Sequence, residues 1–97
     1  MEIKIKAIHF DASEKLESFI TRKIERLARR NDAIEKVDVT LKVIKPESAM
    51  NKEAAIKLVI PQVGEVFASK VADSFEEAVD TAIDALDHQL EKTKRDK

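Results

Sequence analysis

The sequence has no cysteine, tryptophan or tyrosine, and only one glycine and two prolines in 97 residues. The absence of cysteine excludes disulfides, thiolate zinc sites and thiol nucleophiles. With a single glycine, Gly64, the chain cannot form a glycine-rich loop that cradles a phosphate group. We find no signal peptide and no apolar run long enough to span a membrane, so we expect a protein of the reducing cytoplasm.

The titratable residues do not form a recognisable catalytic set. The two histidines, His9 and His88, have no Ser-His-Asp spacing around them, and no pair of acids faces a plausible cleft. Six carboxylates are expected on the face of the C-terminal helix opposite its apolar stripe: Glu76, Glu77, Asp80, Asp84, Asp87 and Glu91. An outward helical face does not wrap a cation. We therefore expect a solvated acidic face, no enzyme activity, no metal, no cofactor and no small-molecule substrate.

Charge is abundant but unevenly distributed. Charged residues make up 38% of the chain, although the formal net charge is only −1. Residues 1–45 hold 11 Lys and Arg against 8 Asp and Glu, whereas residues 46–97 hold 7 against 11. The position of the cations on the folded surface is therefore more informative than the total.

Hydrophobic periodicity predicts six elements. Alternation of apolar and polar residues predicts strands over 2–8, 36–45, 53–60 and about 65–72. A helical period predicts helices from about residue 13 to Arg30 and from Ser74 to about residue 92. Residues 61–64 (PQVG) predict a hairpin turn, Pro46 is expected to end the second strand, and residues 47–51 are expected to form a mobile loop.

The helix starts carry capping signals, and the last residues do not continue a clear pattern. Asp11 with Glu14 fits a capping box, and Ser13 is an alternative cap. Ser74 with Glu77 fits a capping box for the second helix. We expect residues 92–97 to be a frayed basic tail.

The order of the elements predicts one α+β domain over residues 1–97. Its architecture is β-α-β-β-β-α, a four-stranded mixed sheet with two helices packed on one face. The first two strands are joined across a helix and should be parallel with a right-handed crossover, and the other pairs should be antiparallel. The other face of the sheet is then left to solvent or to a partner.

The strongest functional signal is a row of cations at the end of the first helix. Five basic residues fall on one flank of its apolar stripe: Arg22, Lys23, Arg26, Arg29 and Arg30. Glu17 and Glu25 fall on the opposite side, so the cations are not paired at helical spacing. A phosphate backbone would relieve their repulsion. The alternatives are a solvated face whose long stems cover the core edge, and a favourable interaction of Arg29 and Arg30 with the helix dipole.

A second group of cations lies on the strands. The group comprises Lys42 and Lys45 of the second strand with Lys4, Lys6 and Lys70 of other strands. Of these, Lys4, Lys6 and Lys42 should project from the face of the sheet that the helices leave open. Lysines on edge strands also discourage aggregation, which is an equally good explanation for each one. If Phe67 faces the open side, its ring is placed to stack on a base, although such a residue more often covers an edge.

Several segments resemble the family of ribosome hibernation promoting factors and ribosome-associated inhibitors, which is also known as the sigma-factor modulation family. They are SEKLESF (13–19), KIERL (23–27), VDVTLKV (37–43), residues 78–86 and QLEK (89–92). The resemblance covers nearly the whole chain and rests on the order and spacing of these segments. It implies a fold like that of double-stranded-RNA-binding domains.

The resemblance also implies a function. Members bind ribosomal RNA of the small subunit on the path of messenger and transfer RNA, and they inhibit translation in stationary phase or stress. The basic positions that match here are Lys23, Arg26, Lys42, Lys45 and Lys92. With the neighbouring residues, the predicted RNA-binding set is Arg22, Lys23, Arg26, Arg29, Arg30, Lys42, Lys45, His88 and Lys92.

The sequence departs from the family pattern on the second helix. Ala85 and His88 stand where members often have Lys or Arg, and Glu76 replaces a common Tyr. The chain resembles the short form, which has no ribosome-pairing domain, and we expect a monomer when it is free. Two other functions stay open from the residues alone. They are a general duplex-RNA-binding module and a modulator of a transcription factor that binds its partner through the acidic face.

Overall fold

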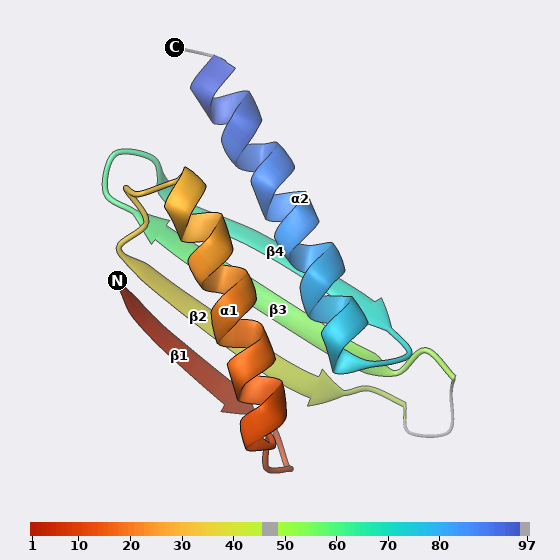
Figure 1. The fold of residues 1–97 in the computed structure, drawn as a ribbon. Coiled ribbons are helices and arrows are strands. Elements are labelled where there is room, and N and C mark those ends of the chain that lie inside the picture. The colour runs from red at the N-terminus through yellow and green to blue at the C-terminus, as the bar shows by residue number, and fades with distance from the viewer. Residues whose placement is uncertain (46–48, 96–97) are drawn as a thin grey trace.

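The computed structural model describes residues 1–45 and 49–95 and shows the predicted β-α-β-β-β-α order (Figure 1). The strands are β1 (Glu2–Ala7), β2 (Lys36–Val43), β3 (Lys52–Ile60) and β4 (Gly64–Ala72), and the helices are α1 (Glu14–Arg30) and α2 (Phe75–Arg95). The α+β class and the element order are therefore confirmed. Within the described ranges, neither helix has the length of apolar sequence that crossing a membrane requires.

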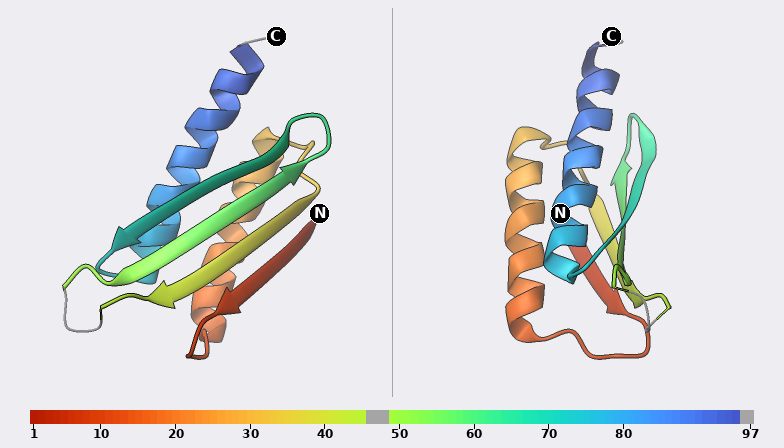
Figure 2. Two further views of the ribbon diagram at one scale, coloured as in Figure 1. Left: turned by 180° about the vertical axis from the view of Figure 1, so that it is seen from behind. Right: turned by 90° about the vertical axis from the view of Figure 1, so that its right-hand side faces the viewer.

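The four strands form one mixed sheet in chain order, β1-β2-β3-β4. β1 runs parallel to β2, with Ile5 opposite Val39, and the two other pairs are antiparallel. The β3–β4 hairpin closes where the Val63 amide donates to the Ile60 carbonyl at 2.9 Å. Gly64 then has a φ of +105°, a conformation that a side chain would disfavour. Both helices cover the same face of the sheet and leave the other face open, as predicted (Figure 2).

The core lies between the two helices and the covered face of the sheet. Every second residue of the inner strands is buried there because side chains alternate across a strand. The α1 stripe contributes Ile20, Ile24 and Leu27, each with no exposed surface, and α2 contributes Leu86. Near the start of α2, the rings of Phe10 and Phe75 stack with their centroids 5.0 Å apart. One apolar layer therefore fixes the position of both helices.

Serine side chains cap both helices. The Ser13 hydroxyl accepts from the Leu16 amide at 3.1 Å, and the Ser74 hydroxyl accepts from the Glu77 amide at 3.1 Å. The capping box predicted for Asp11 is wrong, because the residue directly before the first helical position is Ser13 and the helix begins at Glu14. The alternative cap at Ser13 and the predicted cap at Ser74 are confirmed.

Three element ends differ from the predictions. β2 stops at Val43 and not at residue 45, since Lys45 has a φ of 46° and cannot continue a strand. β3 begins at Lys52 and not at residue 53, so the predicted loop over 47–51 ends at Asn51 as expected, and the buried Asn51 accepts from the Ile44 amide through its carbonyl at 2.8 Å. Pro46 and the first part of that loop lie outside the described residues. The backbone of α2 is helical to Arg95, past the point at which fraying was predicted to begin.

A side-chain hydrogen bond links α2 to the edge strand β4. The Gln89 amide group donates to the backbone carbonyl of Phe67 at 3.1 Å. β4 therefore contacts α2 through this bond as well as through the core residues Val66 and Ala68.

The cap at Ser13 provides a test of the α1 start. Ser13→Ala should lower the free energy of unfolding by about 1 kcal/mol, because the Leu16 amide loses its acceptor. Urea unfolding followed by circular dichroism measures this change. Ser18→Ala, on an exposed turn of the same helix, is the matched control and should change stability by less than about 0.5 kcal/mol. Equal effects of the two substitutions would contradict the assigned cap.

Candidate nucleic-acid interface

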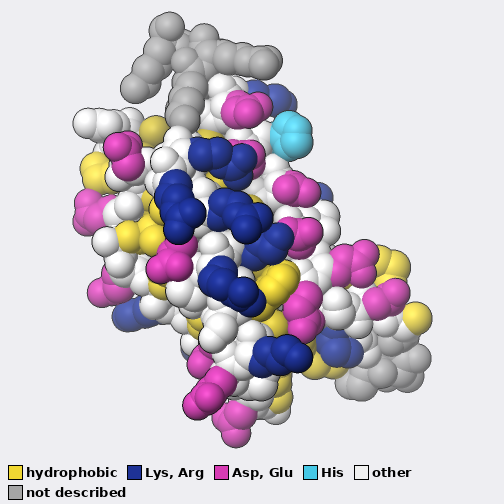
Figure 3. All heavy atoms as spheres, viewed as in Figure 1, with side chains coloured by type: hydrophobic (Ala, Val, Ile, Leu, Met, Phe, Trp, Pro, Cys, Tyr) yellow, Lys and Arg dark blue, Asp and Glu magenta, His cyan; other side chains and the backbone are white. Residues whose placement is uncertain are grey.

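The five predicted cations of α1 form one continuous surface. We call Arg22, Lys23, Arg26, Arg29 and Arg30 the α1 basic face. Figure 3, viewed from the side of the helices, shows Lys and Arg side chains gathered in a row over α1. The cations therefore share one side of the helix, as their spacing predicts. Lys15 extends the row toward the start of the helix, a position that the sequence analysis missed. Its spacing of seven residues from Arg22, two helical turns, was the available signal.

Two members of the α1 basic face are held by carboxylates of α2. Lys23 Nζ lies 3.0 Å from Asp80 Oδ1, and Arg30 Nη2 lies 3.5 Å from Asp87 Oδ2. Asp80 is exposed, as expected of a solvated acidic face, but neither carboxylate is only solvated, since each is in an ion pair with α1, and Asp87 is partly buried. They lie seven residues apart on one flank of α2, and the packing of the helices side by side turns that flank toward α1.

The other cations of this face are not neutralised by a carboxylate in the described part of the chain. Arg22 Nε donates to the backbone carbonyl of Ser18 at 3.4 Å, and Arg26 and Arg29 are in no ion pair with residues of the described ranges 1–45 and 49–95. Arg22, Lys23 and Arg26 line a shallow depression with Phe19, whose ring centroid lies 5.5 Å from Lys23 Nζ. Guanidinium groups beside such a depression suit phosphate oxygens.

Lys42 and Lys45 lie apart from the α1 basic face. Lys42 is exposed near the end of β2, directly opposite Glu53 of β3, and Lys45 follows the strand. Lys42 alternates with the buried Val37, Val39 and Leu41, so it projects from the open face of the sheet. The sheet therefore separates it from the cations of α1.

His88 and Lys92 also lie outside the α1 basic face. Gln89 contacts β4, whereas Asp87 contacts α1, so these neighbours mark the two sides of α2. Lys92 is three residues after Gln89 and shares its side, away from α1. His88 is exposed, and its Nδ1 lies 2.9 Å from the carbonyl oxygen of Asp84. The nine predicted residues thus occupy three regions, and the five on α1 form the only dense cluster among them.

Comparison with known proteins identifies the family. Residues 3–97 match the family described as Sigma 54 modulation protein / S30EA ribosomal protein. The chain belongs to this family. Two Pseudomonas putida proteins named ribosome hibernation promoting factor are each 31% identical to it over 94 residues, which is 97% of this chain and 87% of each relative.

Solved structures confirm the fold. A ribosomal subunit interface protein from Coxiella burnetii superposes with a TM-score of 0.85 at 21% identity, over 98% of this chain and 99% of that one. The N-terminal domain of Protein Y from Thermus thermophilus superposes with a TM-score of 0.80 at 22% identity, over 96% and 99% of the two chains. The four-stranded sheet with two helices is therefore shared across distant sequences.

The ion pairs between the helices predict how α2 affects the α1 basic face. Replacing Asp80 and Asp87 by Asn should strengthen retention on a heparin column, because Lys23 and Arg30 no longer have these carboxylates beside them. The matched control is Asp84→Asn with Glu91→Gln, which changes net charge equally without touching either pair. Since these pairs are partly exposed, stability should fall by no more than about 1 kcal/mol for each. Equal elution of the two variants would show that the pairs do not limit anion binding.

Proposed function

We propose that this chain binds the small ribosomal subunit on the path of messenger and transfer RNA. In this way it inhibits translation during stationary phase or stress, as a ribosome hibernation factor of the cytoplasm. The observation that carries the proposal is the α1 basic face, in a chain that is 31% identical over nearly its full length to proteins named ribosome hibernation promoting factor.

The chemistry of this surface supports binding to RNA backbone. Arg22, Arg26 and Arg29 present planar guanidinium groups, which bind phosphate oxygens through two parallel hydrogen bonds. Contacts of this kind supply affinity without reading base identity. Specificity then comes from the fit of the domain to the shape of folded ribosomal RNA. Lys42, Lys45, His88 and Lys92 are proposed as peripheral contacts from two other parts of the surface.

The proposed mechanism is occupancy and not catalysis. A domain that occupies the RNA path excludes messenger and transfer RNA by volume alone, so the mechanism requires no reacting group, metal or cofactor. We propose that residues 1–97 act as a single ribosome-binding domain and that the fold corresponds to the double-stranded-RNA-binding-domain type. In this proposal, Lys23 and Arg30 exchange a carboxylate of α2 for a phosphate when they engage RNA.

The proposal is tested by cosedimentation with ribosomes and separated subunits on a sucrose gradient. Arg26→Glu with Arg29→Glu should weaken binding at least about 100-fold, since each charge-assisted hydrogen bond contributes about 1.5–3 kcal/mol. Neither residue is in an ion pair among the described residues, so the change leaves the links between the helices intact. The salt dependence of binding should also decrease, by about one unit of slope for each phosphate that the variant no longer binds.

The control is Lys52→Glu with Lys70→Glu, which reverses two charges on neighbouring strands of the sheet. Lys52 lies opposite Val43, at the end of the sheet where β2 finishes, whereas Arg29 is at the end of α1 that precedes β2. This control should comigrate with the small subunit as the unmodified protein does. Unchanged cosedimentation of the Arg26 and Arg29 variant would refute the assignment of the α1 basic face.

A further inference from the structure

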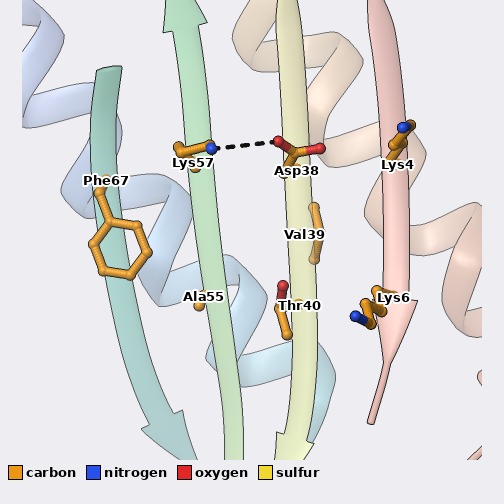
Figure 4. A pocket seen from close by; sticks show the side chains of 8 residues that line it. All are labelled: Lys4, Lys6, Asp38, Val39, Thr40, Ala55, Lys57 and Phe67. Carbon is orange, nitrogen blue, oxygen red and sulfur yellow. Dashed lines mark ion pairs between the residues drawn. The ribbon is translucent and has the colours of Figure 1, made fainter.

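The open face of the sheet carries an exposed aromatic ring on its β4 side. Phe67 is 57% exposed, whereas Phe10 and Phe75 stack on each other at the core. Figure 4 looks onto this face with the helices behind the sheet and shows the ring beside Lys57 and Ala55. Val71, four residues further along the same strand and on the same face, is 37% exposed, but Ser69 separates it from Phe67 and it does not line the depression beside the ring. An aromatic side chain that is this exposed on a sheet face is available for contact with a partner.

The β1 side of the same face carries two lysines. Lys4 and Lys6 are exposed, and no ion pair involves either of them among the described residues. Lys57, in the middle of the face, is different because its Nζ lies 3.7 Å from Asp38 Oδ2 and 3.5 Å from Glu65 Oε2. Among the lysines around the depression, the two that are in no ion pair within the described residues are therefore those of β1, and Lys4 lies opposite Asp38 in the strand register.

A single depression joins the ring to the lysines. Its lining includes Lys4, Lys6, Thr40 and Phe67, together with Lys57 and the Asp38 carboxylate that Lys57 pairs with, and the side chain of Lys6 extends toward Thr40 (Figure 4). Three strand spacings separate β1 from β4, which is roughly 14 Å at about 4.8 Å each. This width accommodates an extended strand of nucleic acid. The depression is too shallow to enclose a compact small molecule.

We propose that this open face is a second binding surface, which takes single-stranded nucleic acid with a base stacked on Phe67 and phosphates at Lys4 and Lys6. An aromatic ring next to cations is the combination that binds unpaired nucleotides without sequence preference. A duplex does not fit this surface, because its bases are already stacked and offer no free ring face. The proposal uses the face of the sheet opposite to α1 and does not depend on the proposed ribosome function.

The test is fluorescence anisotropy with a labelled RNA decamer and a DNA decamer of the same sequence. Phe67→Leu keeps an apolar side chain but removes the ring, and it should raise the Kd about 5- to 150-fold, which corresponds to the usual 1–3 kcal/mol for stacking of one base. Val71→Ala, on the same face and strand, is the matched control and should change the Kd less than about twofold. If the RNA decamer shows weaker binding to Phe67→Leu and unchanged binding to Val71→Ala, the surface accepts ribose. If the DNA decamer does so, the surface accepts deoxyribose.

The lysines provide a second, independent readout. Lys4→Gln with Lys6→Gln should reduce the slope of log K against log salt by about 0.7 for each phosphate that is no longer neutralised. The control is Lys52→Gln with Lys70→Gln, which removes the same charge. These positions alternate with Lys57 and Phe67 along their strands and so lie on the helix side of the sheet. The control should leave the slope unchanged. Thermal melts of all variants should coincide within a few degrees, since each substitution is at the surface.

The outcomes separate this surface from the α1 basic face. Decamer binding that depends on Phe67 and persists in the Arg26→Glu, Arg29→Glu variant supports the proposal, whatever the ribosome gradients show. Decamer binding that is abolished in the arginine variant and unchanged by Phe67→Leu overturns it. The proposal is also overturned if Phe67→Leu leaves decamer binding intact and instead abolishes self-association in sedimentation velocity, because the face would then bind a second copy of the chain.

Discussion

The fold of this protein depends on the burial of one face of its four-stranded sheet beneath two helices. Ile20, Ile24 and Leu27 of α1 lose all their exposed surface in that layer. Burial of a side chain of this size contributes roughly 1.5–3 kcal/mol. Because both helices of the described part use their apolar stripe on the same face, the outward sides of α1 and α2 and the other side of the sheet remain exposed.

The electrostatic properties of the surface follow from the close packing of the two helices. α1 carries a row of cations, and α2 carries carboxylates, two of which reach across to Lys23 and Arg30. This compensation lowers the repulsion within the row, while Arg26 and Arg29 are in no ion pair within the described part of the chain. A formal net charge of −1 therefore coexists with a surface suited to polyanions. Affinity for an anion then reflects a competition between phosphates and the protein's own carboxylates.

Most of the fold was predictable because its determinants are local. Alternation such as Val37, Val39 and Leu41 specifies which face of a strand is buried, and the helical period of α1 specifies its stripe. The order of elements then limits the topology to a few arrangements. The exact ends were less predictable, as at Asp11 and Lys45, because a cap or a left-handed residue depends on a single local conformation.

The candidate site was predictable only in part. The cations on α1 share a helix, so sequence spacing alone places them together. Which carboxylates of α2 meet them depends on the rotation of one helix against the other, a tertiary property that no spacing within α2 contains. The same applies to Lys42, Lys45, His88 and Lys92, whose grouping with α1 came from the resemblance, and the structure places them in separate regions.

The strand order has a consequence for how the chain assembles. β2, β3 and β4 follow one another in sequence and in space, so their antiparallel pairing requires only short-range chain closure. β1 pairs with β2 alone and must wait for α1 to cross the sheet before its parallel register can form. We therefore expect β1 to be the last strand acquired on folding and the first released on partial opening. Amide hydrogen exchange in this six-residue strand should then be the fastest in the sheet.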